Sequence, residues 1–307
     1  MANKSRKGGF GFSTSSLTGP GTAFTLGFIA LAIGMGLLLS RGVTPRSTLS
    51  DPGETGDVEL IIETPAPNQQ GLQLKTLKFR ECGSKAAVGL LVDRSGSMRG
   101  KKIIDLRDAL TSFTGGMSNQ SVVGLSSFSS NDGSVAFRED VAFSRYVDVK
   151  AQLTTAIARL EAAGATNTRT AFENIKVKIL AAKNDPQFAD QQFALIFLSD
   201  GIPEAVPADC ASGRIYPKPT GRRCFANSQD PTQNGDIPKE IKDAGIKIFS
   251  IAIYDADSLE DNYFLPFMRE MMKKIASDDT SYYETPDTGK LKEIYKSIAQ
   301  RICKDAQ

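Results

Sequence analysis

Oxygen-bearing side chains follow two apolar runs of this sequence and occupy a turn between them. Asp93, Ser95 and Ser97 alternate in the loop after the first run, and Asp200 comes shortly after the later one. Thr166 lies in a turn that begins with a glycine. Hard divalent cations such as Mg²⁺ take six oxygen ligands at about 2.0–2.1 Å and tend to retain waters. These residue types therefore predict a site for Mg²⁺ or Mn²⁺.

Each of the five side chains has an expected role at this site. We expect Ser95 and Ser97 to bind the ion directly and Thr166 to bind it directly or through water. Asp93 and Asp200 are expected to act mainly through water while they neutralise charge and orient the serines. Three neutral hydroxyls leave the ion electrophilic, with one coordination position open. The alternative is a serine-rich turn that caps a helix, which leaves Thr166 and Asp200 unexplained.

The composition excludes several classes of function. The 307 residues include no histidine, which rules out Ser-His-Asp and Cys-His nucleophiles, HExxH zinc proteases and His-ligated iron. Lysine and arginine total 37 against 35 acidic residues, and a net charge of +2 gives no general attraction to nucleic acid or to an anionic membrane. We therefore expect a protein that is not an enzyme, does not bind nucleic acid and selects its partner at a local site.

One segment looks superficially like a phosphate-binding loop. Gly96 to Lys102 precedes an expected helix and contains Gly-Lys, but three residues instead of four separate its glycines. Lys102 also stands where such a loop needs a serine or threonine. A nucleophile-elbow esterase needs Gly-x-Ser-x-Gly and a histidine, and neither is present. The sequence thus argues against a nucleotide hydrolase and an esterase.

Short apolar runs alternate with amphipathic stretches through the later part of the chain. Strands that are apolar throughout and alternate with helices imply an α/β, doubly wound, mostly parallel sheet with helices on both faces. Ligands bind such sheets beyond the carboxyl ends of the strands, where the oxygen side chains are expected. The expected strands are 86–92, 122–128, 134–142, 193–198, 246–254 and 281–284, and the expected helices are 101–117, 147–161, 168–182, 238–244, 264–276 and 291–303.

The N-terminal part contains a nearly uninterrupted apolar run over 23–39. This run just reaches across a hydrocarbon core of about 30 Å, and the basic residues before it favour a cytoplasmic N-terminus. The alternative is a cleaved signal peptide, but no Ala-x-Ala-like site follows the run. We expect a single-pass membrane protein whose folded domain lies outside the cytoplasm, at the cell surface or in the periplasm. The expected parts are a short cytoplasmic tail (1–21), a transmembrane anchor (22–40), a stalk (41–80) and the domain (81–305).

The four cysteines match neither a CxxC redox motif nor a zinc-ligand spacing. Cys82 lies just before the first expected strand and Cys303 in the last expected helix, while Cys210 and Cys224 bracket one loop. The pairing Cys82–Cys303 with Cys210–Cys224 needs no long-range threading. The alternative is four buried or free thiols in a reducing compartment.

Together, the three oxygen motifs resemble those of the von Willebrand factor type A (vWA) domain and its metal-ion-dependent adhesion site (MIDAS). Asp93, Ser95 and Ser97 match the family's Asp-x-Ser-x-Ser motif, Thr166 its Thr-x-Thr loop, and Asp200 its Thr/Ser-Asp-Gly turn. Three motifs in the expected order form a specific signal, although each one alone is weak.

The resemblance covers about 85–303 and carries further expectations. It implies a six-stranded sheet with one antiparallel edge strand, and a partner protein whose Asp or Glu carboxylate fills the open metal position. Ala165 departs from the pattern, because many members have glycine there. We expect that change to affect how the loop approaches the metal without removing a ligand.

The segment 203–227 lengthens the connection after Asp200 and is rich in basic and aromatic residues. We expect it to lie beside the metal site and to select the partner, with Arg222, Arg223 and Tyr216 as candidate contacts. The alternative is a solvated insertion that a disulfide stabilises by roughly 3 kcal/mol.

The expected function is that of a membrane-anchored vWA module that binds a protein ligand through a Mg²⁺-bridged carboxylate, in adhesion or in surface or envelope assembly. Arg99, Lys101 and Lys102 near the same rim are expected to attract an acidic partner. Two alternatives remain. One is a structural component of a pilus-like or secretion assembly, and the other is a cytoplasm-facing partner subunit of an ATPase-driven remodelling or metal-insertion complex.

Overall fold

The structure, a computed structural model, describes residues 85–130, 136–204, 214–215 and 224–305. The expected tail, anchor and stalk lie outside these residues and stay predictions. In the part of the chain that the structure describes, no helix is long and apolar enough to cross a membrane. Other expected features that lie outside the described residues are Cys82, Cys210, Tyr216, Arg222 and Arg223.

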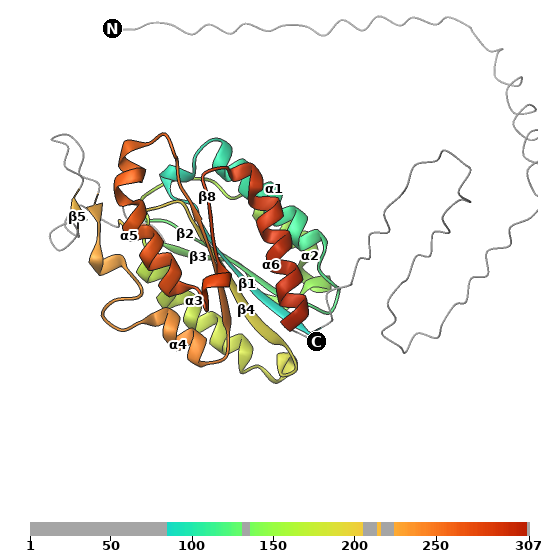
Figure 1. The fold of residues 1–307 in the computed structure, drawn as a ribbon. Helices are drawn as coiled ribbons and strands as arrows, with labels where there is room; N and C mark the ends of the chain where they lie inside the picture. The colour runs from blue at the N-terminus through green and yellow to red at the C-terminus, as the bar shows by residue number, and fades with distance from the viewer. Residues whose placement is uncertain (1–84, 131–135, 205–213, 216–223, 306–307) are drawn as a thin grey trace, which may run out of the picture. The chain divides into compact units, whose positions relative to one another are not determined.

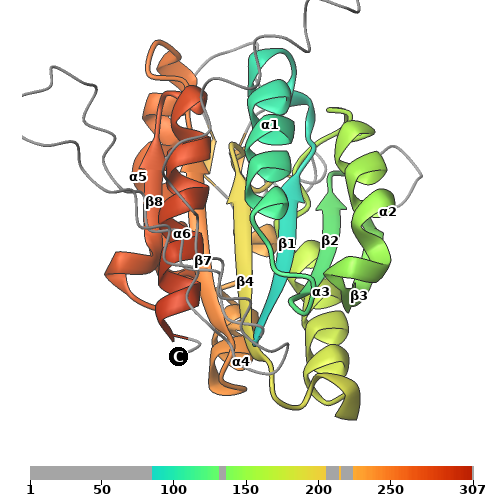
Figure 2. The same ribbon diagram turned by 90° about the vertical axis from the view of Figure 1, so that its right-hand side faces the viewer.

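Six strands form one sheet in the order β3-β2-β1-β4-β7-β8 (Figure 1). Neighbouring strands are parallel except for β3, which runs antiparallel to β2 at one edge. Figure 2 shows β7, β4, β1 and β2 side by side and pointing the same way. The expected mostly parallel sheet with one antiparallel edge strand is thus confirmed. The strands are β1 (Ala86–Asp93), β2 (Val122–Phe128), β3 (Phe137–Arg145), β4 (Gln192–Ser199), β7 (Lys247–Ile253) and β8 (Tyr282–Thr285).

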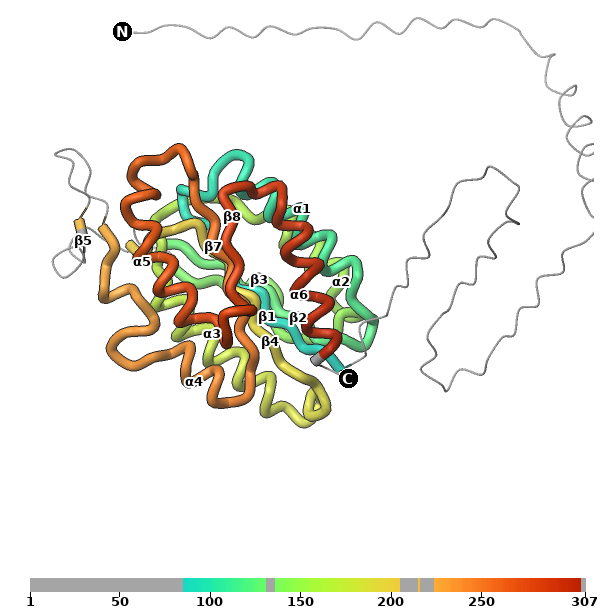
Figure 3. The backbone as a smooth tube through the Cα atoms, in the orientation of Figure 1, coloured from blue at the N-terminus to red at the C-terminus, as the bar shows by residue number. Residues whose placement is uncertain are grey.

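Helices cover both faces of the sheet, with α1, α2 and α6 on one side and α3, α4 and α5 on the other (Figure 3). Successive residues of β1 alternate between two apolar clusters. Leu90 belongs to the cluster that includes Leu106 of α1, and Leu91 to the cluster that includes Phe172 of α3. Burial on both faces explains why the central strands are apolar throughout. The helices are α1 (Lys101–Gly115), α2 (Tyr146–Ala158), α3 (Thr168–Lys183), α4 (Ile237–Asp243), α5 (Leu259–Ile275) and α6 (Leu291–Asp305).

Several element bounds differ from the sequence-based expectation: β3 ends at Arg145 instead of residue 142, and α5 shows the largest shift. α5 begins at Leu259 instead of Phe264, because the Ser258 hydroxyl accepts a hydrogen bond from the Asp261 amide at 3.1 Å and caps an earlier turn. Pro266 consequently lies inside the helix instead of near its start. A short hairpin of β5 (Arg214–Ile215) and β6 (Cys224–Phe225) was not expected within the segment 203–227.

The two cysteines that the structure describes are Cys224 in β6 and Cys303 in α6. Neither of them is free. Their expected partners lie outside the described residues, so the pairings Cys82–Cys303 and Cys210–Cys224 stay predictions.

Candidate metal centre

Two central strands deliver the acidic residues of the site to one edge of the sheet. β1 and β4 are hydrogen-bonded in parallel, with Val92 opposite Leu198. The chain leaves both strands at the same edge, so the loop that begins with Asp93 adjoins the turn formed by Ser199 and Asp200. Residues more than one hundred positions apart in the chain therefore meet where an α/β sheet of this kind binds its ligands.

Asp93 is fully buried, and neutral donors engage both of its carboxylate oxygens. Oδ1 accepts a hydrogen bond from the Ser95 amide at 2.7 Å, which fixes the serine loop. Oδ2 accepts one from the Ser199 hydroxyl at 2.6 Å, which joins this loop to the end of β4. Ser199 was not among the residues expected at the site from the sequence, although its place directly before Asp200 is a usable signal.

A chain of hydrogen bonds links the serines to the second aspartate. The Ser95 and Ser97 hydroxyl oxygens are 2.9 Å apart, and the Ser97 hydroxyl donates to Asp200 Oδ1 at 2.7 Å. The four residues Asp93, Ser95, Ser97 and Asp200 are thus directly connected. This is the grouping that the sequence motifs predict.

Thr166 joins the group through the loop 164–166. The Gly96 amide donates to the Gly164 carbonyl at 2.8 Å, which ties this loop to the serine loop. Ala165 exchanges two backbone hydrogen bonds with Ser130, at 3.0 and 2.7 Å. The alanine that departs from the family pattern therefore lies in a loop held by its backbone. Thr166 itself exchanges two backbone hydrogen bonds with Glu204, at 2.7 and 2.9 Å.

Gly201 shows how closely the three loops approach one another. A Cβ atom at this position would lie 2.6 Å from Thr166 Oγ1 and 3.2 Å from Asp93 Oδ2. The first of these distances is too short for real contacts, so only glycine fits here without displacing the threonine. The Thr166 hydroxyl therefore lies beside the Asp93 carboxylate, as a shared metal site requires.

A cavity of about 280 Å³ opens at this point. It is lined by Ser95, Ser97, Thr166 and Glu204, together with the backbone region of Gly164 and Ala165. Glu204 was not predicted as a site residue, and backbone pairing with Thr166 brings it here. Within the described ranges, no three His, Cys, Asp or Glu residues cluster tightly enough to hold a metal ion. The donors at this cavity are thus mainly hydroxyls.

Two buried carboxylates lie close together here, and a lysine ammonium offsets the charge of one of them, Asp200. Burial, together with the nearby Asp200 charge, raises the pKa of Asp93 to about 7. Burial also raises the pKa of Asp200, against the opposing effects of Lys102 and of the Ser97 hydroxyl. Confining two like charges in a poorly solvated place is costly unless a cation compensates them. The donor set and the charge therefore fit a hard divalent cation.

Lys102 does not have the role expected from the sequence. Its ammonium is not aimed at an outside partner but lies 2.6 Å from Asp200 Oδ2. Lys101, the residue before it, pairs with Asp105 of its own helix. Arg99 donates to the Ala162 carbonyl at 3.4 Å. The three basic residues of the rim are thus engaged within the domain.

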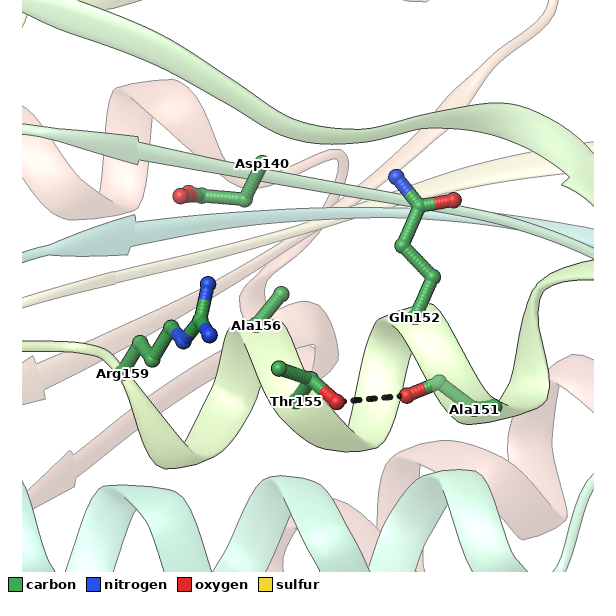
Figure 4. Close-up of a pocket in the computed structure, with 6 residues that line it drawn as sticks. All are labelled: Asp140, Ala151, Gln152, Thr155, Ala156 and Arg159. Atoms are coloured by element: carbon green, nitrogen blue, oxygen red, sulfur yellow. Dashed lines mark hydrogen bonds between the residues drawn. The ribbon is translucent and has the colours of Figure 1, made fainter.

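A second and larger cavity, of about 410 Å³, lies between β3 and α2. Figure 4 shows Gln152 of α2 and Arg159, directly after α2, extending toward the strand that carries Asp140. The Asp140 side chain is 6% exposed and pairs through Oδ1 with Arg138 of its own strand. Its Oδ2 has no hydrogen-bond partner among the described residues. None of the residues predicted to bind metal lines this cavity.

The sequence of this chain matches the model of one known protein family. The family model of the von Willebrand factor type A domain matches residues 88–297, which is more than half of the chain. None of the curated proteins matches it.

Several solved structures are similar to this chain. The pilus adhesin SpaC of Lactobacillus rhamnosus GG is 19% identical, with a TM-score of 0.55 over 72% of this chain and 31% of SpaC. The vWF domain of the type V pili tip protein Mfa5 of Porphyromonas gingivalis is 13% identical, with a TM-score of 0.50 over 73% of this chain and 97% of that domain.

A mussel protein shares the same architecture. Proximal thread matrix protein 1 of the mussel byssus, with a zinc occupied MIDAS motif, is 15% identical, with a TM-score of 0.50 over 73% of this chain and 47% of that one. This chain spans about a third of the length of SpaC. At these identities the likeness shows the fold.

Proposed function

Since this chain belongs to the von Willebrand factor type A domain family, we propose that its hydroxyl-lined cavity binds Mg²⁺ or Mn²⁺ and, through the ion, a carboxylate of a partner protein. The observation that supports this most is that three hydroxyls line one cavity while two buried carboxylates lie behind them, hydrogen-bonded to the serine loop. Ser95, Ser97 and Thr166 would hold the ion, and Asp93 and Asp200 would help to balance its charge. When bound, the ion supplies an electrophilic position that a partner's Asp or Glu can occupy.

This module is similar in fold to domains of pilus proteins, and we propose that it serves adhesion or pilus-like surface assembly. SpaC is a pilus adhesin and Mfa5 a pilus tip protein. The apolar run 23–39 supports a membrane anchor with the domain outside the cytoplasm. Cysteine alkylation on intact cells tests this location. Four thiols that react would place the domain in the reducing cytoplasm and favour the ATPase-partner alternative.

A pull-down with the full chain tests the proposed metal-bridged binding. The chain, solubilised from membranes, is used to capture partners in Mg²⁺ or in EDTA. We expect a specific partner to be retained in Mg²⁺ and lost in EDTA. Thr166→Ala should lose it as well, because Thr166 lines the cavity and its hydroxyl lies close to the Asp93 carboxylate.

The matched control is Thr154→Ala. Thr154 is an exposed threonine of α2 whose hydroxyl donates to the carbonyl of Lys150 in the same helix. This variant should bind like the parent chain. Retention of the partner in EDTA, or by Thr166→Ala, would contradict the proposed function.

The metal bond supplies affinity for any suitably placed carboxylate, so the choice of partner must come from the surrounding surface. We propose that the segment 203–227 makes this choice through Arg222, Arg223 and Tyr216. Replacing both arginines with alanine should weaken the native complex without lowering Mg²⁺ affinity. Unchanged binding would leave this segment as a stabilised surface insertion.

A further inference from the structure

One buried carboxylate of the metal centre carries its own counter-ion. The Lys102 ammonium lies 2.6 Å from Asp200 Oδ2, and the Ser97 hydroxyl donates to Oδ1 of the same group at 2.7 Å. The Asp200 side chain is completely buried, and the Lys102 side chain is only 21% exposed. Both oxygens of Asp200 are thus occupied, and its charge is balanced from within the domain.

The Asp93 carboxylate has a different set of partners. Asp93 accepts hydrogen bonds from an amide and a hydroxyl, which are both neutral donors. These two donors do not offset its negative charge, which a bound cation can balance. The site thus combines one carboxylate that accepts hydrogen bonds from neutral donors and one that pairs with a lysine.

This difference matters for what the bound ion can do. A carboxylate that binds a divalent cation directly takes up a coordination position and lowers its attraction for a second carboxylate. A carboxylate that already pairs with an ammonium gains less by moving to the ion, because it must first leave the lysine. Lys102 is the second residue of α1, and its ammonium is placed to keep Asp200 from moving to the ion.

We propose that Lys102 is a positioning residue that holds Asp200 as a neutralised, outer carboxylate, so that one position of the bound ion stays open for the partner. This inference rests on the proposed function, because it assumes that the cavity binds a divalent cation. It also predicts a trade-off. Lys102 stabilises the metal-free domain and weakens metal affinity, since its charge repels the ion.

Lys102→Met tests this trade-off, because methionine keeps much of the side-chain length without the charge. The matched control is Lys101→Met. Lys101 is the preceding lysine of the same helical turn, its side chain is 70% exposed, and it pairs with Asp105 away from the cavity. Lys102→Arg keeps the charge and should behave like the parent chain. All variants are studied as the full chain.

The probe is Mn²⁺ alone, measured in two ways. Calorimetry gives its affinity, and water-proton relaxation reports how many exchangeable waters each bound Mn²⁺ keeps. We expect Lys102→Met to bind Mn²⁺ roughly tenfold more tightly or better, because a nearby positive charge is gone and Asp200 is released. The bound ion should keep fewer waters than in the parent chain.

Stability in EDTA should change in the opposite direction. Lys102→Met should unfold at a lower temperature than the parent chain when metal-free, because it leaves a buried carboxylate without its partner. A purely structural role for Lys102 would lower metal affinity together with stability.

Affinity and water number equal to those of Lys101→Met, or weaker Mn²⁺ binding by Lys102→Met, would overturn the inference. Should Lys102→Met not fold, Lys102→Gln is measured in the same way, with the same outcomes. If the parent chain itself binds no Mn²⁺, the proposed function fails, and this result is distinct from a failure of the lysine variants.

Discussion

The metal centre and the cavity between β3 and α2 both contain a buried aspartate, but they assemble their polar groups differently. The β3–α2 cavity is the larger, at about 410 Å³ against about 280 Å³. Its lining residues come from one strand, the helix that follows it and the residue directly after that helix, and Asp140 there pairs with Arg138 two residues away. The metal centre instead gathers its side chains from three loops that are distant in the chain.

The predicted metal residues are therefore distinguished by their convergence from distant parts of the chain, and not by the volume of the cavity they adjoin. Oxygen side chains at the metal centre bond to one another across chain separations of 103 and 106 residues. Such contacts require the whole sheet to be formed. They also place buried acidic groups together, which raises the pKa of Asp93 and leaves a charge that a cation can balance.

Gly201→Ala is expected to have the largest effect on the stability and metal binding of the site, because the new methyl group would overlap the Thr166 hydroxyl. Overpacking of this kind costs about 1–3 kcal/mol. We expect urea unfolding to show a loss of this size and calorimetry to show no Mg²⁺ binding. Gly115→Ala, at the end of α1 where an added methyl group meets nothing, is the control and should bind Mg²⁺ normally. Normal binding by Gly201→Ala would mean that Thr166 is not held where the metal site needs it.

Lowering the pH should reduce Mg²⁺ affinity gradually, whereas Gly201→Ala should abolish binding. The pKa of Asp93 is raised to about 7, so the ion must displace a proton at lower pH. Mg²⁺ affinity should fall by about tenfold for each pH unit below 7 and change little above it. Calorimetry across this range measures the slope, and a pH-independent affinity would contradict the shared burial of the two aspartates.

The metal-free domain should respond to pH in a related way. A carboxyl whose pKa is higher in the folded than in the unfolded state binds more protons when folded, so stability falls as pH rises from about 4 to about 7. Asp93→Asn should flatten this part of the stability curve. Thermal unfolding in EDTA at several pH values measures this dependence. If Asp93→Asn showed the same fall in stability as the parent chain, another group would be responsible for it.

The smallest effect is expected at the other cavity. Asp140→Asn keeps the shape of a side chain that lines the β3–α2 cavity and removes its pairing with Arg138. We expect a change in unfolding free energy of about 1 kcal/mol or less, as for most ion pairs near the surface, and Mg²⁺ affinity equal to that of the parent chain. A clear loss of Mg²⁺ affinity would show that the two cavities are coupled.

Much of this site is predictable because its motifs follow apolar strands. Asp93 and Asp200 come after two such runs, and parallel strands place their carboxyl ends together, so the amino-acid sequence alone is enough to group the predicted metal residues. The role of Lys102 is not predictable in this way. The direction of the Lys102 side chain depends on where α1 begins and on where the turn after β4 lies. No local sequence pattern determines either position.

The position of Glu204 and the start of α5 could not be predicted from the sequence either. Glu204 reaches the cavity through backbone pairing with Thr166, a contact between loops that leaves no periodic signal. The start of α5 depends on whether Ser258 caps the helix, and the proline inside it favours a later start. Strands buried on both faces have a strong sequence pattern, whereas loop contacts and helix ends depend on tertiary structure.

The central claim is that the loops after β1 and β4, together with Thr166, form one divalent-metal site. Thermal unfolding of the full chain with and without Mg²⁺ tests it most directly, because a ligand that binds only the folded state stabilises it. Mg²⁺ should raise the unfolding temperature of the parent chain and of Asp108→Ala, an exposed control on α1. It should leave that of folded Asp93→Ala unchanged. An equal rise in Asp93→Ala would contradict the metal site.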